Sequence, residues 1–369
     1  SCPIFAVATR IIEDSSEGVN NGRDNLQGAY VAQKEYNDTH PEAPLCLYIA
    51  NLGSNPGYEP FVARQLVNAA AASNGALVGL IGWPGLLDNP DSLAAVHLLE
   101  KAHMPIVSPE SYDEVQFVSN VFHIAPSRQD QGRRAALYAE HVLHKTRAAI
   151  ITDPANPYSR CLAEGFIQQF EGDGNQILAI QTYATGLTDA RTLAAELSVE
   201  EQVNPDFIYF AGGTGEGSVL LAQLRADSSP LRLLGSEQLY PFVGFSANAR
   251  PGFDRLAFTS SAYVDAPVAS HMQRLYALAF DPQDPGGVRE YGYSRPDSEA
   301  ILSYDAMETL LAAYTDAAGL QSIQQVLPSV RIEGASRQFI AFTRLNELSD
   351  QRLFVLYVDQ QQQISFSTV

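Results

Sequence analysis

Lysine is scarce in this chain of 369 residues: only Lys34, Lys101 and Lys145 are present. The 23 basic residues face 42 acidic ones, which gives a formal charge of −19. No basic run occurs anywhere in the sequence. Nucleic acids and anionic lipid surfaces are bound by clustered Lys and Arg, so this composition argues against both as partners.

Long apolar stretches are also lacking, since none approaches the roughly 18 residues that a membrane-spanning helix needs. No segment is therefore predicted to cross a membrane. The chain opens with Ser1-Cys2-Pro3 and enters an apolar run at once. We expect a processed or trimmed chain, whose start can hide a removed export signal or a missing tether.

Cysteine, with three residues, is too rare for a disulfide framework. Cys2 and Cys46 each stand at the start of an apolar, strand-like run. If those strands are neighbours, one bridge between them is geometrically feasible; otherwise both residues are buried thiols. Cys161 lies on a predicted helix, where we expect it to be a small core residue.

Short apolar runs alternate with helical segments along most of the chain. These runs are nearly continuous, as expected of parallel strands covered by helices on both faces. The alternation predicts right-handed β-α-β units in doubly wound sheets, and because the series restarts near residue 148 it predicts two such domains. The predicted strands are 4–9, 45–50, 76–81, 106–107, 148–152, 177–182, 207–211 and 231–235, and the predicted helices are 25–37, 58–73, 91–102, 159–170, 191–198 and 218–225.

The second half of the chain is less regular. A strand is predicted over 257–264, a long helix over 298–318 and a strand over 354–358. Because this third series is never completed, we expect the chain to return to the earlier domains. The polar stretch 360–363 predicts a hairpin turn between the last strands, and 281–287 a surface loop.

Enzyme motifs are missing from the sequence, including the nucleophile elbow, the metalloprotease helix and the paired-cysteine redox motif. His141 and His144 are three residues apart on a predicted helix and offer half a metal site at most. A solvated helix face is the simpler interpretation of this pair. The sequence therefore predicts neither a metal nor a cofactor.

The glycine-rich segment from Gly212 to Ser218 follows a strand and opens a helix, where backbone N–H groups attract anions. It lacks the P-loop lysine and the third glycine of the dinucleotide motif. Two interpretations stay open: a tight turn at the strand end, or a loop that lets a small ligand approach the backbone. An α/β hydrolase using this segment is the enzyme alternative, but no general base is visible near it.

Ligands of open α/β sheets bind at the carboxyl ends of the strands. At those ends this sequence places aromatic residues, glycine turns and carboxylates. Such side chains suit a small polar ligand held between rings and a few hydrogen bonds. The strand ends are 82–85, 108–112, 153–158, 212–216 and 235–237.

The order and spacing of four stretches resemble the type I periplasmic solute-binding proteins, in particular the leucine/isoleucine/valine-binding branch. The stretches together extend over much of the chain, and their order carries more information than any one of them. They are 25–37 with Gly28 and Ala32, 76–111 ending near Ser108-Pro109, 150–166 with Tyr158-Ser159, and 205–237 ending in Gly235-Ser236-Glu237.

The resemblance implies an α/β fold of two doubly wound parallel-sheet lobes, joined by a three-strand hinge, with a ligand cleft between them. The crossovers are expected near 123–126, 260–265 and 330–334. The amino-terminal lobe is then predicted to comprise residues 1–123 and 265–330. The carboxyl-terminal lobe is predicted to comprise residues 124–264 and 331–369.

The resemblance also implies ligand-binding residues. Tyr158 matches the family's cleft tyrosine, which covers the ligand from the second lobe. Glu237 matches its acidic residue, which pairs with the α-ammonium group of the ligand. Glu110 and Tyr112 stand where the family usually has small residues in contact with ligand, and Gly213 stands where a second cleft aromatic is common.

Trp83 and Asp88 complete the predicted ligand-binding set. Trp83 is either a stacking platform or a side chain of the core or cleft wall. Asp88 belongs to the segment 84–89, which replaces the family's Ser/Thr-rich loop that clamps the ligand carboxylate. This replacement argues against an ordinary α-amino acid and, with Glu110 and Glu237, favours a cationic ligand. Simpler roles remain open: solvent exposure for Tyr158 and Glu110, and a helix cap or an Arg partner for Glu237.

The function implied by the resemblance is non-catalytic binding of a small polar solute, such as an amino acid or a related amine or amide. Hinge closure around the solute would make the chain the substrate-binding component of an ABC-type transporter. Its expected partner is a membrane permease or a signalling protein. Its expected location is periplasmic or extracellular, with a lipid anchor or membrane tether left open. The alternative function is a ligand-sensing input domain of a signalling or regulatory protein.

Overall fold

The computed structural model of the chain describes residues 2–11, 16–83, 89–113, 117–186, 192–193, 202–227, 229–244, 253–280, 295–317, 322–359, 361 and 363–369. Contacts divide the chain into two compact units. Unit 1 comprises residues 1–126 and 262–351, and unit 2 comprises residues 127–261 and 352–369. No helix in the described ranges has both the length and the apolar character needed to cross a membrane.

Unit 1 is built on a five-stranded sheet whose strands are all parallel, in the order β2-β1-β3-β4-β5. Its strands are β1 (Ile4–Thr9), β2 (Cys46–Asn51), β3 (Leu77–Gly82), β4 (Ile106–Ser108) and β5 (Val121–His123). Its α-helices are α1 (Ser16–Thr39), α2 (Glu59–Ala72), α3 (Pro90–Lys101), α8 (Ser270–Phe280), α9 (Ser298–Ala317) and α10 (Ile323–Val326). Short 3-10 helices are η1 (Pro56–Tyr58), η5 (Pro267–Ala269) and η6 (Leu327–Ser329), and a small hairpin pairs β11 (Arg331–Ile332) with β12 (Ile340–Ala341).

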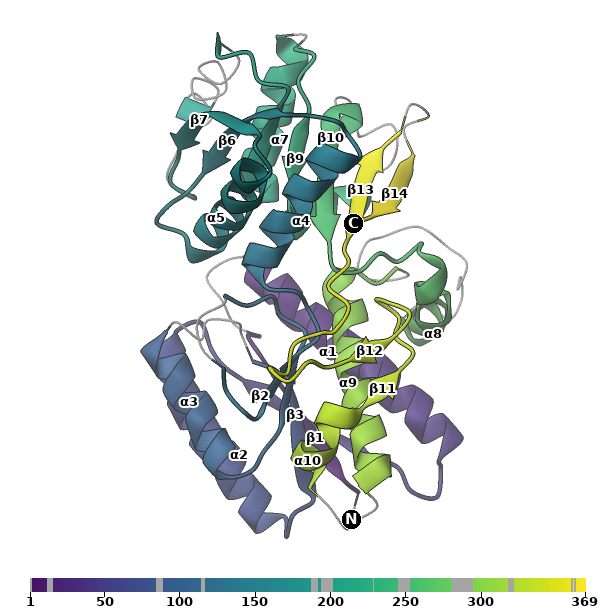
Figure 1. Cartoon of the computed structure of the whole chain (residues 1–369). Coiled ribbons are helices and arrows are strands. Elements are labelled where there is room, and N and C mark those ends of the chain that lie inside the picture. The colour runs from purple at the N-terminus through teal and green to yellow at the C-terminus, as the bar shows by residue number, and fades with distance from the viewer. Residues whose placement is uncertain are drawn as a thin grey trace. The chain divides into compact units, whose positions relative to one another are not determined.

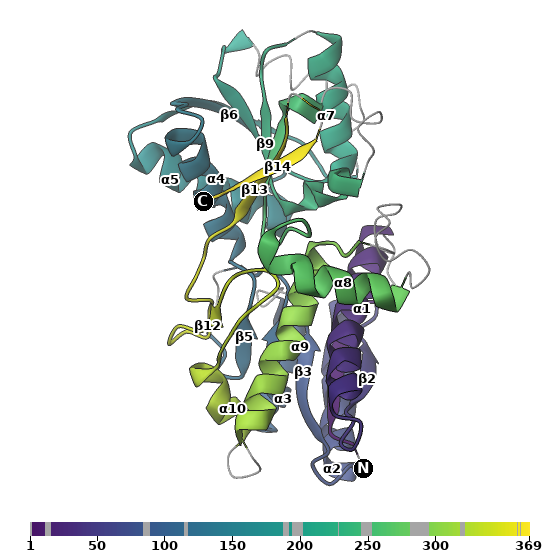
Figure 2. The same ribbon diagram turned by 90° about the vertical axis from the view of Figure 1, so that its right-hand side faces the viewer.

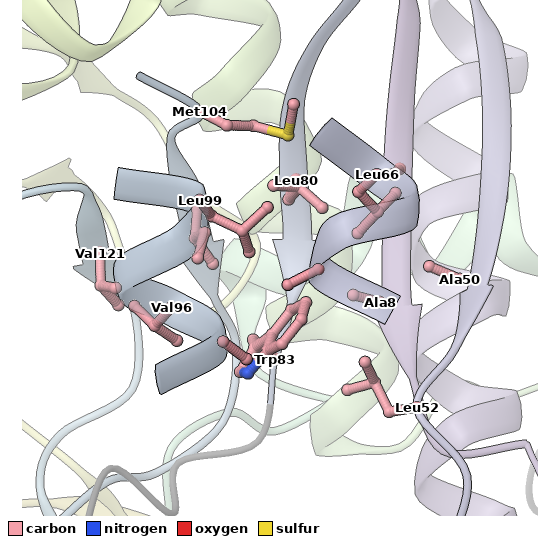
Figure 3. Close-up of a cluster of buried hydrophobic side chains, with 14 of the residues drawn as sticks. Ala8, Ala50, Leu52, Leu66, Leu80, Trp83, Val96, Leu99, Met104 and Val121 are labelled. Carbon is pink, nitrogen blue, oxygen red and sulfur yellow. The ribbon is translucent and has the colours of Figure 1, made fainter. Parts of the chain in front are cut away.

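Helices cover both faces of this sheet, with α2 and α3 on one side and α1 and α9 on the other (Figure 1). The side chains between the sheet and α2 and α3 form one apolar cluster, in which Leu80, Leu99 and Trp83 are buried (Figure 3). On the other face α1 and α9 pack closely, because Gly28 lies against the backbone carbonyl of Ala300 and a Cβ at residue 28 would stand 2.1 Å from that oxygen. Burial of strands on both faces explains why their sequences are continuously apolar.

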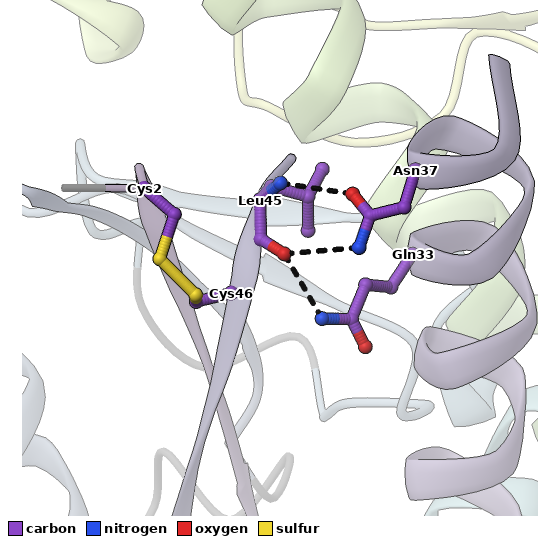
Figure 4. The surroundings of a disulfide bond; sticks show 5 residues. All are labelled: Cys2, Gln33, Asn37, Leu45 and Cys46. Atoms are coloured by element: carbon purple, nitrogen blue, oxygen red, sulfur yellow. Dashed lines mark hydrogen bonds between the residues drawn. A yellow bond between two sulfur atoms is a disulfide. The ribbon is translucent and has the colours of Figure 1, made fainter. Parts of the chain in front are cut away.

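A disulfide joins the amino-terminal end of β1 to that of β2. Cys2 and Cys46 have Cα atoms 5.8 Å apart and are separated by 44 positions in the sequence. Two side chains of α1 hold the residue before Cys46: Asn37 exchanges two hydrogen bonds with the backbone of Leu45, and Gln33 donates a third to its carbonyl (Figure 4). The bridge, left open by the sequence, therefore forms because β1 and β2 are neighbours in register.

Residues 331–351 return to unit 1, although the sequence had assigned them to the other lobe. Asp305, fully buried on α9, accepts hydrogen bonds from the backbone N–H groups of Ala335 and Ser336 at 2.7 and 2.8 Å. The carbonyl of Asn346 accepts a hydrogen bond from the His123 backbone N–H, next to the edge strand β5. The residues that make these contacts lie far apart in the sequence, and no local sequence pattern predicts the contacts.

Unit 2 contains a seven-stranded sheet in the order β14-β13-β10-β9-β8-β6-β7. The five strands from β10 to β7 are parallel, and β13 and β14 form an antiparallel hairpin at one edge. The strands are β6 (Arg147–Thr152), β7 (Gln176–Thr182), β8 (Phe207–Ala211), β9 (Leu233–Gly235), β10 (Leu256–Ser260), β13 (Phe354–Val358) and β14 (Ile364–Thr368), and the helices are α4 (Arg128–His141), α5 (Pro157–Gly172), α7 (Thr214–Ala226) and the 3-10 helices η2 (Glu237–Gly244) and η4 (Phe253–Arg255).

Helices α4 and α5 cover one face of this sheet, and α7 lies on the other (Figure 2). The two helices approach closely, because Gly132 on α4 lies against the carbonyl of Leu162 and Gly165 on α5 lies against the carbonyl of Gln129. Successive side chains of β8 point to opposite faces of the sheet. Tyr209 stacks on Phe166 of α5 with ring centroids 4.0 Å apart. Phe210 instead contacts the position of Gly217 on α7.

The predicted α/β architecture with two parallel-sheet lobes is confirmed. The parallel strands of both units follow one order, in which the second strand along the chain lies outside the first and the third to fifth follow on the other side. The predicted strand over 257–264 is wrong at its end, since β10 stops at Ser260. The predicted helix over 191–198 and loop over 281–287 lie wholly or mostly outside the described residues.

Reduction of the disulfide is expected to destabilise unit 1. A bridge that closes a loop of this length removes unfolded-state entropy equivalent to about 4 kcal/mol. Thermal unfolding with and without a reductant measures the effect. The Cys2→Ser variant should melt like the reduced wild type and should not respond to the reductant. A wild type that melts identically in both conditions would contradict the expectation.

Replacing Asp305 by Ala should release the segment 331–351 from α9. The change leaves two buried backbone N–H groups without their acceptor, at a cost of about 3 kcal/mol in the free energy of unfolding. Denaturant unfolding gives that free energy, and limited proteolysis reports whether the segment has opened. The matched control is Asp316→Ala, an exposed position on the same helix, which should change stability by less than about 0.5 kcal/mol. Equal stability of the two variants would show that Asp305 does not anchor the segment.

Candidate functional site

The order of strands reverses between β1 and β3 in unit 1 and between β6 and β8 in unit 2. In open α/β sheets this switch point, at the carboxyl ends of the strands, is where ligands bind. The predicted site residues follow the carboxyl ends of strands in these two sheets.

Trp83 follows β3 directly, with a left-handed backbone at φ 75°. Its side chain is only 3% exposed and packs in the core cluster beside Leu80 and Val96 (Figure 3). The indole N–H donates a hydrogen bond to the Glu59 carboxylate at 3.1 Å. The structure thus places Trp83 as a core side chain at the switch point, and a role in stacking on a ligand stays a prediction.

Glu59 is completely buried, and Arg10 at the end of β1 lies 3.6 Å from its carboxylate. Burial raises the pKa of Glu59, and the neighbouring Ser92, Arg10 and Trp83 oppose that rise. The Glu59 carboxylate thus forms an ion pair with Arg10, which follows β1, and accepts a hydrogen bond from Trp83, which follows β3. This pair fixes the residues on either side of the switch point.

Glu110 lies beyond the end of β4, where its backbone N–H donates to the Ser108 hydroxyl at 3.3 Å. The side-chain amide of Asn25 donates to the Glu110 carboxylate at 2.9 Å and also lies 3.3 Å from the Thr9 hydroxyl. Asn25 is fully buried on α1, and the sequence offered no reason to connect it to Glu110. The half-buried carboxylate is therefore tied to α1 by a hydrogen bond.

Tyr112 is buried, and its ring stacks on that of His123 with centroids 3.7 Å apart. His123 ends β5 and pairs in register with Ser108 of β4. Burial lowers the pKa of His123 to about 3, so this imidazole is uncharged at neutral pH. Asp88, which the sequence analysis included in the same site, lies outside the described residues.

Tyr158 stands at the start of α5 in unit 2, where Asn156 caps the helix. Its hydroxyl is 2.9 Å from that of Ser236, and the Arg128 guanidinium lies 5.5 Å from its ring centroid. Burial, and then the charge of Glu237, raise the pKa of Tyr158 well above its ordinary value. Tyr158 is therefore a neutral hydroxyl that is packed against the core of unit 2, not a plain surface aromatic.

Glu237 follows β9 and opens η2. The amide of Gln131 on α4 donates to one carboxylate oxygen at 3.0 Å, and the hydroxyl of Ser261 donates to the other at 2.9 Å. These two bonds fix the direction of the carboxylate. We call Glu237, Gln131, Ser261, Ser236 and Tyr158 the Glu237 cluster.

Two members of the Glu237 cluster were missed by the sequence analysis. Gln131 is a polar residue on the buried face of α4, and a polar residue on a face predicted to be buried would have been the sequence signal for it. Ser261 comes directly after β10, and the rule of strand ends would have found it if that strand had been ended at residue 260. Both are polar residues with almost no exposure, at 1% each.

Gly213 is the N-cap of α7, and a Cβ there would meet only the Gln238 side-chain oxygen at 3.4 Å and Glu216 beyond it. Gly212 has no such space, because a Cβ would overlap Phe210 and the Tyr183 hydroxyl. Packing thus requires glycine at residue 212, whereas residue 213 has room for a side chain. A ligand contact at Gly213 stays a prediction.

Two serine hydroxyls near the glycine turn are hydrogen-bonded within the fold. Ser218 donates to the carbonyl of Thr214, one turn earlier on α7. Ser159 donates to the carbonyl of Ala211 and accepts a hydrogen bond from the backbone N–H of Asp153. Among the described residues, no group of three or more His, Cys, Asp or Glu side chains is arranged to hold a metal. The hydrolase alternative gains no support from this geometry.

The sequence matches the family model described as periplasmic binding protein over residues 11–361. Among solved structures, a leucine-binding protein LivK from Thermotoga maritima is 22% identical with a TM-score of 0.76, covering 99% of this chain and 98% of that one. The branched-chain amino acid transporter substrate-binding protein LivJ from Streptococcus pneumoniae, in complex with isoleucine, is 17% identical with a TM-score of 0.75 and coverage of 100% and 99%. A solute-binding protein from R. palustris in complex with benzoate is 14% identical with a TM-score of 0.75 and coverage of 99% and 95%. No curated protein sequence matches the chain.

Two substitutions distinguish the contribution of the Tyr158 hydroxyl to stability from that of its ring. Tyr158→Phe removes one hydrogen bond to Ser236 and should lower the free energy of unfolding by about 1 kcal/mol. Tyr158→Ala also removes the half-buried ring from the core and should lower it by about 2–3 kcal/mol. Denaturant unfolding of the free protein measures both. An Ala variant as stable as the Phe variant would mean that the ring is not packed.

Proposed function

Because the chain belongs to the periplasmic binding protein family, we propose that it captures a small polar solute without altering it and delivers it to a membrane permease. The solute is an amino acid or a related amine or amide. The chain is then the substrate-binding component of an ABC-type transporter.

The Glu237 cluster is the observation that carries this proposal. A carboxylate held in one orientation by hydrogen bonds from Gln131 and Ser261 needs little reorganisation when a ligand with an amino group arrives. Charge-assisted hydrogen bonds of this kind are about twice as strong as neutral ones. The adjacent Tyr158 and Ser236 hydroxyls supply donors and acceptors for the remaining polar atoms of a solute.

The matched structures support a small solute, since the Streptococcus pneumoniae protein is seen with isoleucine and the R. palustris protein with benzoate. Both ligands have a carboxylate and an apolar part, but only isoleucine has an amino group, and only benzoate has an aromatic ring. The fold therefore accepts different chemistry through its strand-end side chains. In this chain the oriented acid Glu237 favours a solute with an amino group.

We propose that binding follows hinge closure, in which the two units close on the solute. A ligand shifts such an equilibrium only by its differential affinity for the closed form. Micromolar affinity corresponds to about −8 kcal/mol, which a few charge-assisted bonds and one or two buried rings supply. A permease that recognises the closed form then receives the solute.

The Cys2–Cys46 bridge supports a location outside the cytoplasm. Disulfides persist in oxidising compartments such as the bacterial periplasm and are rare in the cytosol. We therefore propose a periplasmic or extracellular location. This location is where a substrate-binding protein meets both its solute and its permease.

The proposal is tested by a thermal-shift screen of amino acids, amides, amines and organic acids, followed by calorimetry on each compound that raises the melting temperature. Glu237→Gln should weaken the binding of an amino-bearing solute by on the order of 2 kcal/mol, about 30-fold. The matched control is Glu164→Gln, which makes the same charge change at an exposed position of α5. It should leave the affinity unchanged.

Two outcomes would overturn the proposal. One is a screen in which no solute raises the melting temperature of the wild type. The other is steady chemical conversion of the compound that binds. If a solute binds and Glu237→Gln has no larger effect than Glu164→Gln, the solute-binding role stands and Glu237 is removed from the site.

A further inference from the structure

Two buried aspartate side chains meet where α1 packs against α9 in unit 1. Asp24 lies on α1 and is 1% exposed, and Asp297 directly precedes α9 and is 4% exposed. The two carboxyl groups are hydrogen-bonded to each other. Ionised carboxylates only accept hydrogen bonds, so two carboxyl groups that bond to each other need a proton between them.

The helices around the two acids hold them together. Gly28, one turn further along α1, lies against the carbonyl of Ala300 and brings the two helix backbones into contact. One carboxylate oxygen of Asp297 accepts a hydrogen bond from the Ala300 backbone N–H at 3.0 Å, which fixes Asp297 at the first turn of α9. The hydroxyl of Ser303 donates to the Asn25 carbonyl at 2.7 Å and ties the helices a second time. The acids therefore cannot separate unless the contact between α1 and α9 opens.

The two oxygens of the Asp24 carboxyl group have different surroundings. Oδ1 accepts a hydrogen bond from Arg23 Nε at 2.8 Å, and Arg23 Nη2 lies 2.7 Å from the same oxygen. Oδ2 is buried and accepts no hydrogen bond from any donor in the part of the chain that the structure describes. A buried carboxylate oxygen without a donor is costly, whereas a protonated oxygen can itself donate to the neighbouring carboxylate.

The neighbouring charges favour the same proton. Burial first, and then the charge of Asp297, raise the pKa of Asp24 to about 9, and the charge of Arg23 opposes that rise. The titratable group of α8 on this side is Tyr276, which acts on Arg23 and donates its hydroxyl to Gln27 at 2.8 Å. Two carboxyl groups that share a buried site titrate as a pair, so the proton belongs to both residues.

We infer that Asp24 and Asp297 form a proton-binding site that holds α1 against α9. One proton lies between the two carboxyl groups in the folded protein, and it passes to solvent when the pH rises. Its loss places two negative charges in a buried contact, which opens in response. Asn25, the next residue on α1, donates to Thr9 and to Glu110 at the carboxyl edge, so the change extends to the predicted site of unit 1. The proposed solute-binding function does not enter this inference.

The pH dependence of stability tests the inference, with Asp24→Asn as the first variant. An amide at this position keeps an acceptor for Arg23 and a donor for Asp297 at every pH, so it reproduces the protonated acid. The pKa in the folded protein lies above the ordinary value of 3.8, so the stability that the proton contributes is complete in acid and is lost as the pH rises toward 9. Denaturant unfolding should show the folding equilibrium constant of the wild type falling relative to that of the variant, by about tenfold per pH unit between about pH 5 and 8.

Asp297→Asn should behave as Asp24→Asn does, because either amide takes the place of the shared proton. The matched control is Asp316→Asn, the same change at an exposed position of α9, which should follow the wild type at every pH. Infrared spectroscopy gives a second readout, since a protonated carboxyl group has its own carbonyl stretching band. At neutral pH that band should be weaker by one group in both amide variants. Other acids whose pKa burial raises, such as Glu308, contribute equally to the wild type and the variants.

Three results would overturn the inference. One is a stability of Asp24→Asn relative to the wild type that does not depend on pH, because Asp24 would then have only a structural role. Another is an infrared band that is the same in the wild type and in both amide variants. The third is a wild type whose stability follows the concentration of sodium or calcium ions and not the pH, because a metal ion would then lie between the carboxylates. In each case the proposed solute-binding function is unaffected.

Discussion

The strand order shared by the two sheets determines where every candidate side chain lies. In each unit the second strand lies outside the first, and the third to fifth continue on the other side, so that the chain leaves two adjacent strands in opposite directions. Helices cover both faces, which leaves the carboxyl edge as the part of the sheet where loops diverge and polar groups collect. Trp83 and Glu110 lie at that edge in unit 1, and Tyr158 and Glu237 lie at it in unit 2.

Buried acidic residues hold parts of unit 1 together. Glu59 is buried with Arg10 and the Trp83 indole, and Asp305 is buried with two backbone N–H groups. Removing a partner from such a group leaves a buried charge or a buried donor uncompensated, so these acids hold strand ends and segments in place. Glu110 and Glu237 lie at the carboxyl edges and accept hydrogen bonds from the side-chain amides of Asn25 and Gln131.

The sequence predicted the parts of the fold that depend on local pattern. Continuous apolar runs such as Ile4–Thr9 and Phe207–Ala211 marked the parallel strands, because strands buried on both faces carry no alternation. The sequence did not predict the contacts between residues that are far apart along the chain. The assignment of residues 331–351 to unit 1 depends on Asp305, and the neighbours of Glu110 and Glu237 come from helices 85 and 106 positions away. Their positions after predicted strands and the family resemblance identified the two acids as candidates. The packing of α1 and α4 shows which amides bond to them.

The two oriented acids have a common arrangement that bears on the mechanism. In each unit the amide donor stands on a helix that packs against a second helix through glycine: Asn25 lies one turn before Gly28 on α1, and Gln131 precedes Gly132 on α4. Close helix contact leaves these donors little freedom, since Asn25 and Gln131 are at most 1% exposed. The direction of each carboxylate is therefore set by the helix packing of its own unit, before any solute arrives. In the solute capture that we propose, this preset direction lowers the cost of binding, because the Glu237 carboxylate need not reorganise when the solute arrives.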